Sequence, residues 1–212
     1  MKGPASLTIR PLALMYAVVC LMAMAAPIAA QRGAITRPQH LNELVEESAV
    51  ILRGTVSSAR VEPHPQFRGL HTVLITLRVE ETLKGNAVVS YTFRQYIWDA
   101  RDRMDAAGYR KGQRLLLLLI APNQHGLSSP AGLEQGRFRI ERDAQGREHA
   151  VNGHGNAGLL RNVESAAAKK GAPLPQALAR AAAEHRSGPL ELDELRAMIR
   201  ALAGSTAKGG AQ

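Results

Sequence analysis

The chain has 212 residues, of which 45% are hydrophobic, and its formal net charge is +9 at pH 7. This length suffices for one domain with a buried core plus a short appendage, and the composition is that of a globular protein. Cys20 is the single cysteine, which excludes a disulfide framework and any metal site built from several cysteines.

The first thirty residues resemble a secretory signal peptide. Lys2 and Arg10 form a basic head, an unbroken apolar run fills 11–26, and small residues fill 27–30. We therefore predict a signal peptide over 1–30 that is cleaved after Ala30, so that the mature chain begins at Gln31.

Three other interpretations of this segment are less favoured. Cleavage after Ala25 is the second choice for the processing site. A membrane anchor is disfavoured because the apolar run is short for a bilayer span, and lipid attachment at Cys20 is disfavoured because Val18 and Val19 precede it. The expected product is an exported protein, periplasmic or secreted, with no stable membrane anchor.

The charge of the mature chain bears on its partners. Two of the nine net positive charges belong to the signal peptide, which leaves +7. An exported basic protein meets anionic lipids, polysaccharides or acidic proteins, and export removes nucleic acid as the usual partner.

A short helix precedes the first strand. Residues 40–49 predict a helix with Leu41, Leu44 and Val45 on one face. Residues 49–61 predict a strand that carries, along one side, Val50, Leu52, Gly54, Val56 and Ser58. Gly54 in this row permits a sharp bend or a close approach of another backbone.

The next segments predict a hairpin and a central strand. Residues 71–81 alternate clearly between apolar and polar, and residues 88–95 follow after a turn, with Val89, Tyr91 and Phe93 directed inward. A loop that holds at most one helical turn covers 96–112. The five leucines after Arg114 predict a central strand covered on both faces.

The last third of the chain changes in character. Residues 137–141 and 147–151 predict a second hairpin, which completes a β-barrel domain over 31–160. Residues 161–173 read as a linker. Helices are expected over 174–185 and 190–202, within a helical appendage at 174–204, and the second helix carries an apolar stripe of Leu192, Leu195, Ile199 and Leu202. The tail at 205–212 is expected to be disordered.

These elements predict a mainly β fold. Their arrangement in hairpins favours a small antiparallel five-stranded OB-like barrel with a short N-terminal helix and a C-terminal two-helix appendage, with a β-sandwich as the alternative.

Four segments carry a resemblance to a known group of proteins: AVILRGTV, VLITLRVEETLKGN, YRKGQRLLLLL and LEQGRFRIERDAQG. They resemble bacterial exported proteins of uncharacterised role, whose barrels are similar to the inhibitory domain of the tissue inhibitors of metalloproteinases (TIMP-like). The resemblance covers roughly residues 39–152. It implies a TIMP-like barrel and, as a possible activity, inhibition of a secreted metalloprotease. Those inhibitors chelate zinc through an N-terminal cysteine, and Gln31 stands at that place here, so their mechanism does not carry over.

The sequence shows no motif that predicts catalysis or cofactor binding. His149 and His154 near Glu148, and His64 with His71, are the closest histidine pairs, but surface histidines are the favoured reading of both. The carboxylates of Asp99, Asp102 and Asp105 are interleaved with arginines, which favours a solvated loop over a cation site. We therefore expect no catalytic residue, no cofactor and no metal, and a non-enzymatic protein.

A cationic face is the candidate binding surface. It consists of Arg137, Arg139 and Arg147, close to Tyr96 and Trp98, with Arg78 and Arg94 as further members. Such a face suits a polyanion or a sugar chain, although outward strand positions are polar in any case. The predicted function is an exported binding or accessory module of the cell envelope, with anionic polysaccharide as a possible ligand. The alternative is an inhibitor or partner of a secreted metalloprotease.

Overall fold

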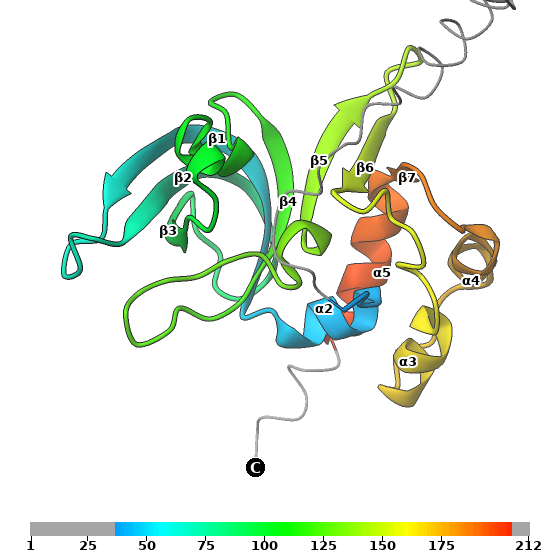
Figure 1. Ribbon diagram of the computed structural model, residues 1–212. Coiled ribbons are helices and arrows are strands. Elements are labelled where there is room, and N and C mark those ends of the chain that lie inside the picture. Colours follow the sequence, from blue (N-terminus) through cyan, green and yellow to red (C-terminus); the bar gives the residue numbers. More distant parts are fainter. Residues whose placement is uncertain (1–36, 205–212) are drawn as a thin grey trace, which may run out of the picture. The chain divides into compact units, whose positions relative to one another are not determined.

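The computed structural model describes residues 37–204. The predicted signal peptide and the predicted disordered tail lie outside the described residues. The elements in chain order are α2 (Leu41–Glu47), β1 (Val50–Pro63), β2 (His71–Lys84), β3 (Ser90–Tyr96), η1 (Ala100–Arg103), η2 (Ala106–Gly108), β4 (Arg114–Leu119), η3 (Leu133–Gln135), β5 (Arg137–Arg142), β6 (Glu148–Asn152), α3 (Val163–Lys169), α4 (Gln176–Glu184), β7 (Leu190–Glu191) and α5 (Leu192–Gly204) (Figure 1). The fold is therefore mixed α/β rather than mainly β.

The strands form one seven-stranded antiparallel sheet in the order β3-β2-β1-β4-β5-β6-β7. The first four strands make a Greek key, because β4 returns by a long connection to lie beside β1. The antiparallel pairing and the flanking helices are as predicted, but the strands do not close into a five-stranded barrel. In such a barrel β5 would pair with β3, but here its two edges are occupied by β4 and β6, so no edge remains for β3.

A tyrosine occupies the space where the barrel would close. Tyr109, from the connection between β3 and β4, is buried, and its hydroxyl donates to Oε1 of Gln95 on β3 at 3.0 Å. On the other side the Arg137 guanidinium of β5 lies 4.6 Å from the centre of the Tyr109 ring. Side chains thus connect β3 to β5 in place of a backbone ladder.

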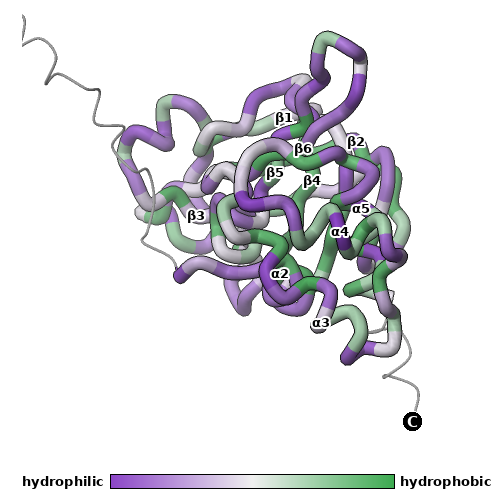
Figure 2. The backbone as a smooth tube through the Cα atoms, turned by 90° about the vertical axis from the view of Figure 1, so that its right-hand side faces the viewer, coloured by the Kyte–Doolittle hydropathy of each residue, from purple (hydrophilic) through white to green (hydrophobic). Residues whose placement is uncertain are grey.

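The leucine-rich strand β4 is covered on both faces, as predicted. Leu115, Leu117 and Leu119 pack into a core on the concave side of the curved sheet, against residues of β1, β2 and β3. Leu116 and Leu118 belong to a second core on the other face. Figure 2 shows hydrophobic segments gathered where the strands and helices meet, while the connecting loops are mostly hydrophilic.

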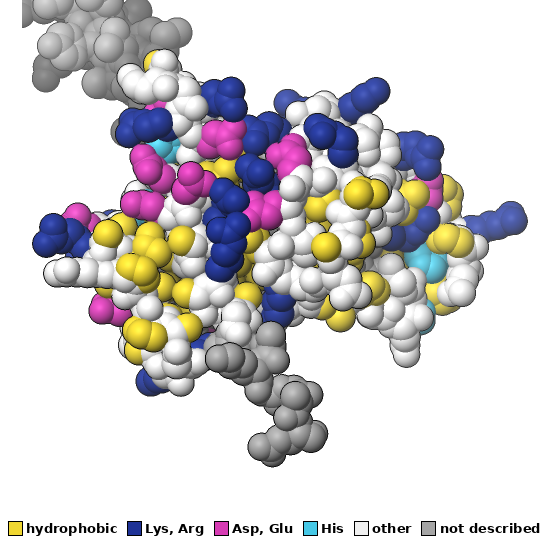
Figure 3. All heavy atoms as spheres, turned by 180° about the vertical axis from the view of Figure 1, so that it is seen from behind, with side chains coloured by type: hydrophobic (Ala, Val, Ile, Leu, Met, Phe, Trp, Pro, Cys, Tyr) yellow, Lys and Arg dark blue, Asp and Glu magenta, His cyan; other side chains and the backbone are white. Residues whose placement is uncertain are grey.

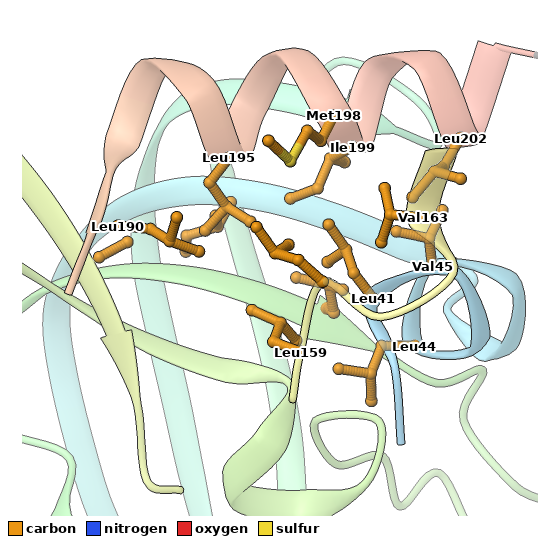
Figure 4. Close-up of a cluster of buried hydrophobic side chains, with 14 of the residues drawn as sticks. Leu41, Leu44, Val45, Leu159, Val163, Leu190, Leu195, Met198, Ile199 and Leu202 are labelled. Atoms are coloured by element: carbon orange, nitrogen blue, oxygen red, sulfur yellow. The ribbon is translucent and has the colours of Figure 1, made fainter. Parts of the chain in front are cut away.

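Helices cover the second core. Figure 4 shows side chains of α2, β7, α5 and the 159–163 segment pointing toward one another, and ten are labelled there: Leu41, Leu44, Val45, Leu159, Val163, Leu190, Leu195, Met198, Ile199 and Leu202. The predicted apolar stripe of α5 is confirmed, since Leu192, Leu195, Ile199 and Leu202 are at most 1% exposed. The sheet and the C-terminal helices therefore share a core.

Two local predictions differ from the structure. The segment 161–173, predicted as a linker, contains the helix α3, whose Val163 and Ala167 are buried against the second core. Val89, predicted to point inward, is 86% exposed because it precedes the first residue of β3.

Gly54 allows the close backbone approach that its position predicted. A Cβ at Gly54 would lie 2.4 Å from the carbonyl oxygen of Arg78 on the neighbouring strand. At this place Arg53 pairs with Glu81 and Gly54 with Val79, so the pairing skips Glu80 and the strand bulges. The bulge brings two consecutive carboxylates near the same arginine, Arg53, at 3.8 and 3.4 Å.

Candidate binding surface

The structure does not bring the five predicted surface residues together. The side chain of Arg137 is only 12% exposed, and it pairs with Glu134 at 3.0 Å, donates to the carbonyl of Ala107 at 2.7 Å and covers Tyr109. Burial raises the pKa of Tyr109 to about 12. Arg137 therefore holds the fold together and was wrongly assigned to an outer face.

The other two predicted arginines lie on the β5–β6 hairpin. Arg139 is half exposed, with Nε 3.4 Å from Glu141, and Arg147 lies 3.0 Å from Asp143 and 3.4 Å from Glu191. Figure 1 shows this hairpin reaching away from the loop between β1 and β2. These arginines and the aromatic residues thus belong to different parts of the molecule.

Tyr96 and Trp98 do form a pair, as the sequence placed them. Their rings meet edge to face with centroids 4.8 Å apart, and Trp98 is 67% exposed. Between them Ile97 is buried and its N–H donates to the carbonyl of His71 at 3.1 Å. The anchored backbone fixes the aromatic pair at the end of β3 while one ring remains in solvent.

A third aromatic residue stands in the loop between β1 and β2, and sequence reasoning missed it. Phe67 is 45% exposed, yet its ring stacks on His64 at 5.1 Å and meets His125 edge to face at 5.0 Å. His125 belongs to the loop between β4 and β5. The two loops therefore hold Phe67 from both sides.

His64 locks the two loops to each other. It is 3% exposed, and its Nδ1 accepts the backbone N–H groups of Gln66 at 3.2 Å and Phe67 at 3.3 Å. A ring that accepts at Nδ1 carries its proton on Nε2, which then donates to the carbonyl of His125 at 2.9 Å. The sequence suggests His64 only as a possible metal ligand. Its partner His125 is 61 residues away, so no local pattern could predict this contact.

Strand pairing places both loops and the aromatic pair at one end of the sheet. Pro63 pairs with His71 and Thr72 with Tyr96, while Leu127 of the β4–β5 loop bridges to Arg94 of β3. We call Phe67, Tyr96, Trp98 and His125 the loop-end surface.

An ion pair supports this end from the strands below. Arg94, whose side chain is 14% exposed, lies 2.7 Å from Glu62 and also donates to the hydroxyl of Thr72 at 2.9 Å. Arg94, expected on a cationic face, is therefore neutralised. Arg78, the other additional member of that face, is 70% exposed.

Several of the side chains that suggested chemistry have structural partners. Nε2 of His149 lies 2.9 Å from Asp143, a contact that holds the pKa of Asp143 at about 2. The carboxylates of Asp99 and Asp105 cap the turns η1 and η2 by accepting the backbone N–H groups of Arg101 and Gly108. Within residues 37–204, no group of three or more His, Cys, Asp or Glu side chains is placed to hold a metal ion.

A network of ion pairs fastens α5 to the sheet. Glu81 of the β2 bulge lies 2.7 Å from Arg196 and 3.4 Å from Arg53, and it also contacts Arg200. Glu148 on β6 continues the network through Arg114. Figure 3 shows acidic and basic side chains interleaved on one face of the molecule. These ion pairs therefore stabilise the packing of α5 on the sheet.

In the part of the chain that the structure describes, no helix is long and apolar enough to cross a membrane. Comparison with known proteins brings no match, whether to a protein-family model, to a curated protein or to a solved structure.

Proposed function

We propose that this protein is an exported, non-enzymatic binding module whose loop-end surface contacts its partner. The observation that best supports this proposal is that exposed aromatic rings are held in fixed orientations by neighbouring rings. Trp98 is 67% and Phe67 45% exposed, although Tyr96, His64 and His125 fix their orientations. Rigid aromatic side chains lose little conformational entropy on binding, which is why they dominate many recognition surfaces.

The proposed ligand is an anionic polysaccharide of the cell envelope. Exposed aromatic rings offer flat apolar faces to sugar rings, and the OB-type arrangement of loops is used for oligosaccharides. The excess of basic side chains in the mature chain favours a ligand of negative charge.

The test is cosedimentation of the processed protein with insoluble envelope polysaccharide. Trp98→Ala is expected to weaken binding about tenfold or more, as truncation of a central aromatic anchor does. Met104→Ala is the matched control, because Met104 is another exposed apolar side chain, 91% exposed, outside the loop-end surface. Equal binding by the two variants, or no binding by the wild type, would contradict the proposal.

Export is tested separately. The segment 1–30, fused to a reporter enzyme that is active only outside the cytoplasm, is expected to give activity. Replacing the apolar run by polar residues is the control. Recovery of the unprocessed chain from the cytoplasm would contradict the export part of the proposal.

A further inference from the structure

A groove lies between α2 and α3, away from the loop-end surface. Its volume is about 490 Å³, and its lining consists of Asn42, Glu46, Asn162, Ser165, Ala166, Lys169 and Lys170. Figures 1 and 2 show the two helices as neighbours, and residues of α2 and α3 are in contact. Nothing in the proposed function uses this groove.

Lysines gather around the groove although lysine is rare in this chain. The part of the chain from 37 to 204 contains four lysines: Lys84, Lys111, Lys169 and Lys170. Lys169 and Lys170 line the groove, and Lys84 donates to the carbonyl of Val45 in the last turn of α2 at 2.8 Å. Burial lowers the pKa of Lys84, and the charge of Lys170 lowers it further. The ammonium groups of Lys84 and Lys170 therefore lie close enough to repel each other, and Lys169 lines the same groove.

The charge of these lysines is not neutralised in the way the arginine charges are. Within residues 37–204 the ion pairs use arginine or His149 as their cation, and Lys84, Lys169 and Lys170 form none. Glu46 is the acidic side chain in the groove lining, and it acts on Lys84. Lys169 and Lys170 against Glu46 leave a charge of +1 in the lining, and the neighbouring Lys84 raises the local charge to about +2.

We infer that this groove binds a phosphate monoester group. Such a group carries about −1.5 to −2 charges at neutral pH, which matches the local excess, and presents three acceptor oxygens. Lysine binds phosphate as a compact point charge with three donors. The amide groups of Asn42 and Asn162 in the lining add further hydrogen-bonding capacity. Binding of an anion would relieve the repulsion between Lys84 and Lys170, which favours this class of ligand.

The test is titration of the processed protein with inorganic phosphate at constant ionic strength, followed by calorimetry or NMR. The double variant Lys169→Gln/Lys170→Gln is expected to bind about 30-fold more weakly, which corresponds to about 2 kcal/mol at about 1.4 kcal/mol per factor of ten. The control is Arg110→Gln/Lys111→Gln, which removes the same charge from two exposed residues elsewhere. The control is expected to change phosphate affinity less than about twofold.

Two results would overturn the inference: no saturable phosphate binding by the wild type, or equal weakening in both double variants. Vesicles of phosphatidylcholine with and without phosphatidic acid then distinguish the source of the group. Lysine-dependent binding to the phosphatidic acid vesicles assigns a lipid headgroup, whereas phosphate binding without vesicle binding assigns a soluble or polymer-borne phosphate. Neither result depends on Trp98, so the groove and the loop-end surface can fail independently.

Discussion

The substitution Gly54→Ala tests the bulge at which β1 meets β2. The added Cβ would lie 2.4 Å from the carbonyl oxygen of Arg78, and backbone atoms surround it. To reach an ordinary contact distance, one strand must move by about 1 Å relative to the other, because no flexible side chain can give way. Gly54 does not have a positive φ, so the cost is steric rather than conformational.

Strain of this kind costs about 1–3 kcal/mol, and a backbone contact belongs at the upper end of that range. For a domain of this size, about 3 kcal/mol lowers the melting temperature by about 6–12 °C. Urea unfolding followed by circular dichroism measures the free energy of unfolding directly. Gly69→Ala is the matched control, since a Cβ there has nothing within 4 Å, and its stability is expected to change by less than about 1 kcal/mol. Equal stability of the two variants would refute the close approach and, with it, the placement of Glu80 and Glu81.

Two further predictions concern other side-chain contacts within the sheet. Tyr109→Phe removes the hydroxyl that donates to Gln95 and is expected to lower the free energy of unfolding in urea by about 1 kcal/mol. Unchanged stability of this variant would contradict the hydrogen bond. Hydrogen bonds from Arg114 and Arg142 hold the pKa of Glu148 at about 2, below its unfolded value, so this group stabilises the fold fully above about pH 5 and loses that effect as pH falls toward 2. Glu148→Gln is expected to flatten the acid limb of the stability curve, and an unchanged acid limb would contradict the network.

The alternation of apolar and polar residues predicted most of the strands, because it is a local signal. The apolar row of β2 and the leucines of β4 are buried as their spacing requires, and the covering of β4 on both faces follows from its lack of polar positions. What alternation does not contain is the partner of each strand. The pairing of β5 with both β4 and β6, which keeps the barrel open, depends on residues that are far apart in the sequence.

The helix α3 was missed although its sequence favoured it. The segment VESAAAK consists mostly of residues with high helix propensity, but the small, basic and turn-forming residues from Ser165 to Pro175 favoured a linker. Val163 and Ala167 lie four positions apart and are buried, so the stripe was present with two members.

Only part of the candidate surface was predicted from the sequence, for a similar reason. Tyr96 and Trp98 are two residues apart, so their proximity was local, and the structure places them together. Phe67 and His125 come from loops whose meeting depends on the Greek key, and no local pattern reports it. Arg137 stands at a position of β5 that alternation predicts to be exposed. The Tyr109 ring packs against its guanidinium and buries it.

The open sheet and the second core share one strand, β6. This strand takes the edge of β5 at which a barrel would close, and its Ala150 packs with Leu190 and α5 in the second core. With that edge occupied, β3 has no backbone ladder with β5. Side chains connect the two strands instead, because Tyr109 contacts Gln95 of β3 and Arg137 of β5. The same strand thus contributes to the burial of α5 and to the open sheet, while Phe67 and Trp98 lie at the loop end of β1, β2 and β3.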